Sequence, residues 1–114
     1  MSAMFEFGNQ GLLVNADMND NSDNHPNPHH DAGIALSFDV YNVGDEPGEA
    51  RVGMECDGTF IAEWTSPTVA PGQNAAAYES IGRFPAGEHT FLVYVNPGSG
   101  NANADHAENR RVID

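Results

Sequence analysis

Apolar and polar residues alternate along much of this chain, and the clearest example runs from Gly33 to Asn42. Ile34, Leu36, Phe38 and Val40 fall at every second position, with small or polar residues between them. Successive side chains of a strand point to opposite faces, so this pattern predicts a strand with one buried and one solvent-facing side. Turn-forming residues follow it directly and end the strand. The same pattern recurs along the chain, which predicts an all-β protein.

Further short segments carry alternating or compact apolar patterns between Gly, Pro, Asn and Asp residues. We expect strands at Met4–Phe7, Leu12–Val14, Ala50–Cys56, Thr59–Thr65, Asn74–Ile81, Glu88–Val95 and Arg110–Ile113. Seven or eight antiparallel strands with regular turn signals predict a β-sandwich. At 114 residues, the chain is expected to form a single domain, 1–114.

The Asp57-Gly58 pair marks a tight turn between two of these strands, which predicts a β-hairpin. On the second strand of the hairpin, alternation places Phe60, Ala62 and Trp64 on one face. We therefore expect Trp64 to pack in the core beside Phe60.

The strand expected at Glu88–Val95 has apolar side chains on both faces, because Leu92 and Tyr94 lie opposite Phe91 and Val93. Such a strand either occupies a central position in its sheet or contributes to an oligomer contact.

The composition is strongly acidic, with 17 Asp and Glu against four Arg, no Lys and a net charge of -13. This charge repels nucleic acid and anionic membrane surfaces, and it suits cations, a basic partner or a saline habitat. We expect no membrane insertion, because no apolar run approaches the length of a spanning helix. The first residues show no classical secretion signal.

One cysteine, Cys56, excludes an internal disulfide. It is expected to be a small buried group on a strand. Its neighbours Glu55 and Asp57 should raise the pKa of the thiol, so we expect no reactive thiolate there. His89 and His106 are expected to be surface or edge residues, although His106 could form a second weak cation site with the acids beside it. The serines lie in no nucleophile elbow, and we predict that the protein is not an enzyme.

A long polar loop is expected from Asn15 to Asp31, reaching residue 32, because it is rich in Asp, Asn and His. Four of its oxygen-bearing residues recur at every second position, as in the start of a calcium-binding loop. These calcium candidates are Asp17, Asn19, Asn21 and Asp23. The EF-hand pattern then fails, since Ser22 replaces its glycine and Pro28 its glutamate. A calcium site of another type and a solvated loop without metal remain alternatives.

The same loop ends with imidazole and carboxylate groups that suit zinc or another transition metal. The candidates are His25, His29, His30 and Asp31. Adjacent histidines rarely both bind one ion on a rigid scaffold, so the loop could equally be metal-free.

Several turn motifs occur in a familiar order along the chain. They are Asn42-Val43-Gly44, the Asp57-Gly58 hairpin, Val69-Ala70-Pro71-Gly72-Gln73, Gly87-Glu88-His89-Thr90, Val93-Tyr94-Val95-Asn96-Pro97 and Glu108-Asn109. This order resembles the CARDB family, a cell-adhesion-related domain of bacteria and archaea, over roughly Gly33 to Asn109. The resemblance implies an immunoglobulin-like sandwich without catalytic activity that contacts proteins or glycans. It also favours an extracellular, cell-surface or virion-associated location.

These observations predict a non-catalytic binding or adhesion module that meets a protein or glycan through its end loops, Asn15–Asp31 and Asn96–Ala107. The expected contact residues are Tyr41, Tyr94, Asn101 and Asn103. The alternative is a structural subunit of a homo-oligomer or larger assembly, such as a virion decoration or surface filament protein. A third hypothesis is a metal-dependent enzyme that uses the His/Asp loop.

Overall fold

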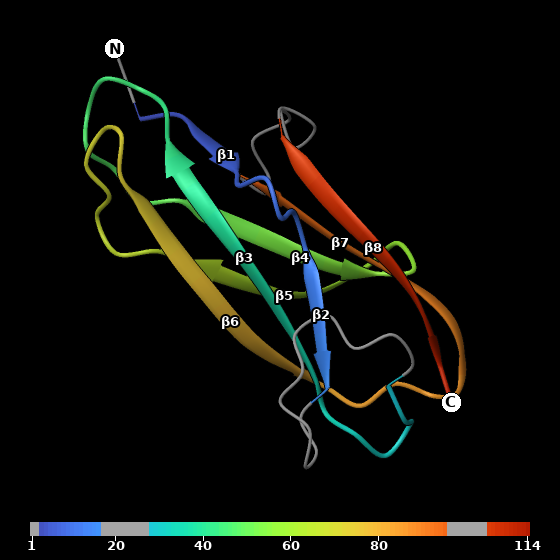
Figure 1. Cartoon of the computed structure of the whole chain (residues 1–114). Helices are drawn as coiled ribbons and strands as arrows, with labels where there is room; N and C mark the ends of the chain where they lie inside the picture. Colours follow the sequence, from blue (N-terminus) through green and yellow to red (C-terminus); the bar gives the residue numbers. More distant parts are fainter. Residues whose placement is uncertain (1–2, 17–27, 96–104) are drawn as a thin grey trace.

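The computed structural model describes residues 3–16, 28–95 and 105–114, and within them the chain forms two four-stranded antiparallel sheets packed face to face (Figure 1). No helix long and apolar enough to cross a membrane occurs in these residues. The all-β sandwich expected from the alternating pattern is confirmed.

The first sheet is built around β3 (Ile34–Asn42), the strand with the clearest alternation. One side of β3 pairs with β6 (Asn74–Gly82), and the other side pairs with two short strands, β1 (Phe5–Phe7) and β2 (Leu13–Ala16). Figure 1 shows these two blue strands following one another along β3. This edge of the sheet is therefore interrupted between β1 and β2.

The second sheet has the order β5-β4-β7-β8. Its strands are β4 (Arg51–Cys56), β5 (Thr59–Thr65), β7 (Gly87–Val95) and β8 (His106–Ile113). The predicted hairpin joins β4 and β5. β7 lies between β4 and β8, and this central position explains why apolar residues occur on both of its faces.

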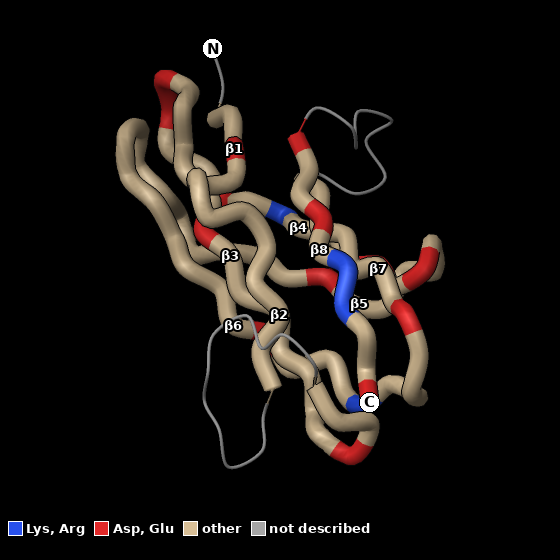
Figure 2. Tube along the Cα trace, turned by 45° about the vertical axis from the view of Figure 1, so that its right-hand side comes forward, with Lys and Arg blue, Asp and Glu red and all other residues tan. Residues whose placement is uncertain are grey.

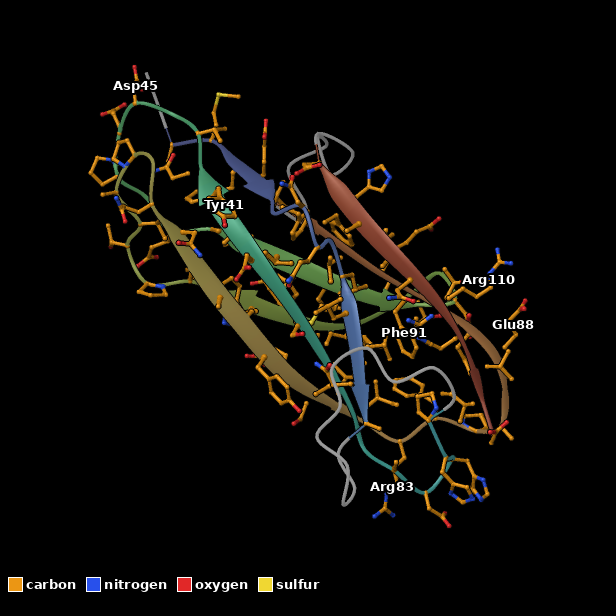
Figure 3. The ribbon with its side chains drawn as sticks, in the orientation of Figure 1. Tyr41, Asp45, Arg83, Glu88, Phe91 and Arg110 are labelled. Carbon is orange, nitrogen blue, oxygen red and sulfur yellow. The ribbon has the colours of Figure 1, made fainter. Side chains whose placement is uncertain are left out.

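The core lies between the two sheets and is made by the inward-facing residues that the alternation predicts. Phe91 of β7 points into this interior (Figure 3) and is fully buried. It is joined by inward residues of β3, β4 and β7, namely Ile34, Leu36, Phe38, Val40, Val52, Met54, Cys56, Val93 and Val95. Cys56 is buried on a strand, as expected.

The prediction that Phe60 shares the inward face with Trp64 is wrong. Met54 pairs with Ala62 but Glu55 pairs with Phe60, so β5 contains one extra residue at a bulge. The extra residue turns Phe60 outward, where it is 53% exposed. Trp64 stays on the core side and meets the edge of Phe38, with 5.5 Å between the ring centroids.

The last strand is longer than its local composition suggests. We expected a loop through Ala107 and a strand from Arg110, whereas β8 begins at His106. Pairing with Tyr94 supplies backbone partners that the weak β-propensity of this segment does not reveal. His106 is thus a strand residue, although it is exposed as expected.

β8 and Asp105, the residue just before it, tie the two sheets together. The backbone N–H of Phe7 donates to Oδ2 of Asp105 at 2.6 Å. Further along, the side-chain amide of Asn109 donates to the carbonyl of Leu12 at 2.8 Å. The interrupted edge of the first sheet is therefore held by the edge strand of the second.

The expected polar loop is shorter at its start. Asn15 and Ala16 belong to β2, where they pair with Ala35 and Ile34 and are buried. The Asn15 amide donates to Oγ of Ser37, which satisfies a polar group that the sequence had suggested was in solvent.

Candidate functional site

Most of the residues predicted to bind metal or a partner from the two polar loops lie outside the described residues. These are Asp17, Asn19, Asn21, Asp23 and His25 of the first loop, and Asn101 and Asn103 of the second. Their roles stay predictions.

The structure does bring together the last three residues of the predicted metal loop. The rings of His29 and His30 stack with 4.2 Å between centroids, and Nε2 of His30 lies 3.6 Å from the Asp31 carboxylate. Nδ1 of His30 lies 2.8 Å from the carbonyl oxygen of Asp114, whereas Nδ1 of His29 accepts the Asp31 backbone N–H at 3.1 Å. All three side chains are about half exposed or more. We call this group the terminal cluster.

A second group of potential ligands lies at the tip of the β4–β5 hairpin, where it meets the start of β7. Sγ of Cys56 is 3.6 Å from Oδ2 of Asp57 and 3.8 Å from Nδ1 of His89. Nδ1 of His89 is 2.7 Å from the same Asp57 oxygen. We call Cys56, Asp57 and His89 the hairpin cluster. Within the described part of the chain, these two clusters are the groups of three whose ligand atoms converge.

Backbone groups orient the hairpin cluster. Nε2 of His89 donates to the carbonyl of Pro85 at 2.8 Å, and the backbone N–H of Thr90 donates to Oδ1 of Asp57 at 2.9 Å. Asp57 itself adopts a positive φ of 53°, which the Asp57-Gly58 turn requires. The hairpin tip is therefore fixed to β7 by side chains as well as by the sheet.

The electrostatics of the hairpin cluster argue against nucleophilic catalysis there. Burial, and secondly the Asp57 carboxylate, raise the pKa of Cys56 to about 11, so the thiol is protonated at neutral pH. Burial works to lower the pKa of His89, but its bonds to Asp57 and Pro85 prevail and raise it. Hydrogen bonds from Thr90 and then from His89 lower the pKa of Asp57. The pKa of Cys56 is thus raised in the expected direction, with burial as the main cause and Asp57, but not Glu55, as the contributing neighbour.

The outer face of the first sheet carries a different kind of candidate. Cross-strand neighbours share a face, so Leu13, Ser37 and Tyr78 form one row and Asp39 and Ala76 form the next. At the interrupted edge, these rows border an open hollow of about 310 Å³. Its lining includes Gln10, Leu13, Ser37, Asp39, Ala76 and Tyr78. We call this surface the tyrosine face.

Tyr41 continues the tyrosine face toward β1. Its side chain points outward from β3 in Figure 3 and is 40% exposed. It borders a second open hollow, of about 370 Å³, with Glu6, Phe7 and Val43. The predicted contact role of Tyr41 is thus compatible with its position. Met4 and Val43, 59% and 50% exposed, extend an apolar strip beside it.

Tyr94, the other predicted contact residue, lies on the outer face of the second sheet. Its ring covers Gly53, where an added Cβ would lie 2.7 Å from Cζ of the tyrosine. Burial, followed by the nearby Glu55 and Glu63 carboxylates, raises the pKa of Tyr94. This ring is packed onto its own sheet and offers less contact area than Tyr41 or Tyr78.

Charge is distributed unevenly over the described surface. Figure 2 shows acidic positions on many elements, whereas basic positions are confined to a few, including a pair on β8. Arg110 and Glu88 project outward at the side of the second sheet (Figure 3). The weak cation site considered as an alternative for His106 and the acids beside it is not among the ligand groups that converge in the described residues.

Sequence reasoning missed the hairpin cluster and the hollow of the tyrosine face. The cysteine beside the Asp57-Gly58 turn was a local signal, but only the register of β7 shows that His89 faces it. For the hollow, the signal was the pair Gly8 and Gly11 between two short strands. An interrupted edge follows from such a break only once both strands are known to pair with β3.

Comparison with known proteins identifies the fold. No protein-family model matches the sequence, and no curated protein matches it. Among solved structures, the chain is similar to the CARDB domain of a Pyrococcus furiosus protein, whose crystal structure is described as a complex with di-metal ions. That match has a TM-score of 0.69 and 12% identity, covering 98% of this chain and 89% of the other.

The solution structure of the same Pyrococcus furiosus domain matches with a TM-score of 0.66 and 16% identity, covering 90% of this chain and 93% of that one. The C-terminal domain of wzt matches with a TM-score of 0.52 and 13% identity, covering 97% and 74% respectively. The protein therefore has a CARDB-like, immunoglobulin-like β-sandwich fold, which confirms the resemblance seen in its turn motifs.

Proposed function

We propose that this protein is a non-catalytic recognition module that binds a neutral glycan on the tyrosine face. The observation that carries the proposal is the hollow at the interrupted edge of the first sheet, where Tyr78 stands beside a floor of small and polar side chains. Ligand sites commonly combine apolar walls with a few polar groups that fix orientation. The CARDB-like fold supports a binding role over a catalytic one.

The chemistry of the lining suits a sugar. Pyranose rings have apolar C–H faces, which can pack on the ring of Tyr78 or Tyr41, and hydroxyl groups around their edges. Gln10, Ser37 and Asp39 offer donors and acceptors for those hydroxyls. Because the hollow is open, it can bind an internal segment of a long glycan and does not require a glycan end.

Net charge narrows the class of glycan. At -13, the protein repels uronic, sulfated and sialylated chains, and Asp39 brings a carboxylate to the site itself. We therefore expect neutral or amino-sugar polymers to bind in preference to acidic ones.

A panel of immobilised neutral, amino and acidic oligosaccharides tests this proposal, followed by NMR titration of the best binder. Replacing Tyr78→Ala should weaken binding by about tenfold through loss of ring contact. Phe60→Ala is the matched control, because Phe60 is as exposed but lies on the other sheet. Absence of binding across the panel, or an equal effect of both variants, would overturn the proposal.

Assembly into a structural subunit is the second candidate, and the apolar strip of Met4, Tyr41 and Val43 favours it. Exposed apolar residues that cluster at one end of a sheet are typical of protein contacts. Light scattering at several salt concentrations should then show a defined oligomer that Val43→Asp converts to a monomer. A monomer throughout would count against assembly and leave the glycan proposal in place.

The similarity to a CARDB domain described with di-metal ions supports a capacity for metal binding here. Both the terminal cluster and the hairpin cluster bring together side chains that could bind a metal ion. Calcium binding by the first polar loop and a surface location of the protein stay predictions.

A further inference from the structure

We propose that the hairpin cluster is a zinc site, in which Cys56, Asp57 and His89 bind one Zn²⁺ and the fourth position is open to water. The site lies in the second sheet and is independent of glycan binding on the first. Thiolate, imidazole and carboxylate are the three ligand types that Zn²⁺ uses in proteins.

The spacing of the ligand atoms fits a tetrahedral ion. Bonds of about 2.0 to 2.3 Å place neighbouring ligand atoms of tetrahedral zinc roughly 3.3 to 3.8 Å apart. The sulfur of Cys56 lies 3.6 Å from Asp57 and 3.8 Å from His89. Only the contact between His89 and Asp57, at 2.7 Å, must open, because there the metal replaces a shared proton.

The register of the sheet produces this arrangement. Cys56 pairs with Phe91 across β4 and β7, and His89 lies two residues before Phe91 on the same face. Cys56 and His89 are therefore diagonal neighbours, within reach across the pair of strands. Asp57 follows Cys56 in the tight turn and reaches the same point, since its backbone N–H donates to the Thr90 carbonyl at 2.9 Å.

The groups behind the ligands are those that metal sites require. A metal-binding histidine usually donates its other ring N–H to a carbonyl or carboxylate, which fixes the nitrogen that faces the metal. Nε2 of His89 makes this bond to Pro85, so Nδ1 faces Cys56 and Asp57. Oδ1 of Asp57 is held by Thr90, which leaves Oδ2 for the metal.

One side of the hairpin cluster is buried and the other faces solvent. The ring of His89 packs near Phe84 and Phe91, with centroids 5.9 and 6.4 Å away, and Cys56 is buried. The Asp57 side chain is 50% exposed. Zinc would therefore enter past Asp57 and retain water on that side.

Zinc binding releases protons from the hairpin cluster. The Sγ–H bond breaks as the Sγ–Zn bond forms, and the proton shared by His89 and Asp57 also leaves, so both pass to solvent. The site holds a protonated thiol when empty, and its affinity for zinc should rise with pH.

The terminal cluster is the natural control, because it contains two histidines and a carboxylate but no sulfur. Its side chains are exposed, and Nδ1 of His29 already accepts a backbone N–H. A metal bound there would show no thiolate signal.

Cobalt titration of the chelator-treated, reduced full-length protein tests the proposal. We expect one equivalent of Co²⁺ to give tetrahedral visible bands and a thiolate-to-cobalt charge-transfer band, both removed by Zn²⁺. Cys56→Ser should abolish the charge-transfer band, and the His29→Asn/His30→Asn double variant should leave it unchanged. Zn²⁺ should also raise the melting temperature of the wild type.

A second variant keeps the test decisive if Cys56→Ser does not fold. Asp57→Asn retains an oxygen for the Thr90 bond but loses the anionic ligand, so Co²⁺ affinity should fall by tenfold or more while the thiolate band survives at saturation. Absence of that band in the wild type would overturn the proposal. So would visible bands that vanish only in the His29→Asn/His30→Asn variant, which would place the metal in the terminal cluster.

Discussion

The two sheets differ in how a tyrosine lies on the outer face of each. On the second sheet, Tyr94 packs over Gly53 in the centre of the sheet, and an ion pair joins Arg51 to Glu63 at 3.0 Å. On the first sheet, Tyr41 also lies over a glycine, Gly8, yet 40% of it is exposed.

The difference arises from where the glycine lies. Gly53 is buried in β4, which is paired on both sides, so the ring above it is supported on both sides. Gly8 lies on the interrupted edge between β1 and β2, where the sheet leaves hollows beside the ring. A break in one edge strand therefore converts a closed face into one with room for a ligand, which is why we assign recognition to the first sheet.

We expect the first sheet to be stable even though its outer face is open. The hydrogen bonds of the Asn42 side chain provide the strongest test of this expectation. Its buried amide donates to the carbonyls of Glu46 and Val69 at 2.8 and 2.9 Å, and its Oδ1 accepts from Met4 and Gly44. Asn42→Ala removes all four hydrogen bonds, although the Val69 carbonyl keeps its bond from the Gly48 backbone N–H. We expect a loss of about 3 kcal/mol in the free energy of unfolding. Urea denaturation measures it.

The matched controls separate this network from a general effect of truncation. Asn74→Ala, in the exposed neighbouring strand, should change the free energy of unfolding by less than about 0.5 kcal/mol. Asn42→Asp keeps the acceptor but loses both donations, so its effect should be intermediate. If Asn42→Ala and Asn74→Ala changed the free energy of unfolding equally little, the hydrogen bonds of Asn42 at the end of β3 would not stabilise the first sheet.

The two glycines beneath the tyrosines provide the direct comparison of the faces. Gly53→Ala forces Cβ against the ring of Tyr94, and we expect a loss of about 1 to 3 kcal/mol in unfolding free energy. In Gly8→Ala the Cβ would lie 2.9 Å from Tyr41, but that ring can swing into solvent, so the loss should stay below about 1 kcal/mol.

A double variant identifies the cause. If the ring contact is responsible, Gly53→Ala should cost much less when Tyr94→Ala is already present, which denaturant melts of the four-member cycle would show. Equal costs at Gly53 and Gly8 would mean that the two faces do not differ in packing.

Local pattern was sufficient to predict the sandwich but not its irregularities. The alternation in β3 and the Asp57-Gly58 turn define strands and a hairpin from neighbouring residues alone. One extra residue in β5 moves Phe60 to the outer face of the sheet. The alternating pattern of the sequence does not reveal such a bulge. The start of β8 was missed because its pairing with β7, and not its composition, makes it a strand.

The candidate sites depend even more on register. His89 and Asp57 are 32 residues apart, and they meet only because β4 pairs with β7 in one particular alignment. Each residue in isolation favoured an ordinary interpretation: a buried cysteine, a turn aspartate and an edge histidine. By contrast, His29, His30 and Asp31 were easy to group because they are consecutive.

The hairpin cluster should make the stability of the second sheet depend on pH in metal-free buffer. The pKa of His89 is raised above its ordinary 6.5, so its contribution is complete below that value and is lost as pH rises through the folded-state pKa. The pKa of Asp57 is lowered from 3.8, so its contribution is lost as pH falls through that lower value. Urea melts from pH 4 to 9 in chelator would show the alkaline loss.

His89→Gln removes the titrating group but keeps a donor, and it should flatten the alkaline part of this profile. His106→Gln is the control, since His106 is exposed on β8, and the profile should keep its shape. A wild-type profile that does not fall as pH rises from 6.5 would show that protonation of His89 beside Asp57 adds no stability.

The smallest effect is expected for the ion pair on the closed face. The side chains of Arg51 and Glu63 are 55% and 34% exposed, so water and salt screen their attraction. Arg51→Ala should cost about 0.5 kcal/mol or less in unfolding free energy, and Arg51→Ala combined with Glu63→Ala should show little coupling in urea melts. A coupling above about 1 kcal/mol that survives high salt would mean that charge, as well as the ring of Tyr94 over Gly53, closes the second sheet.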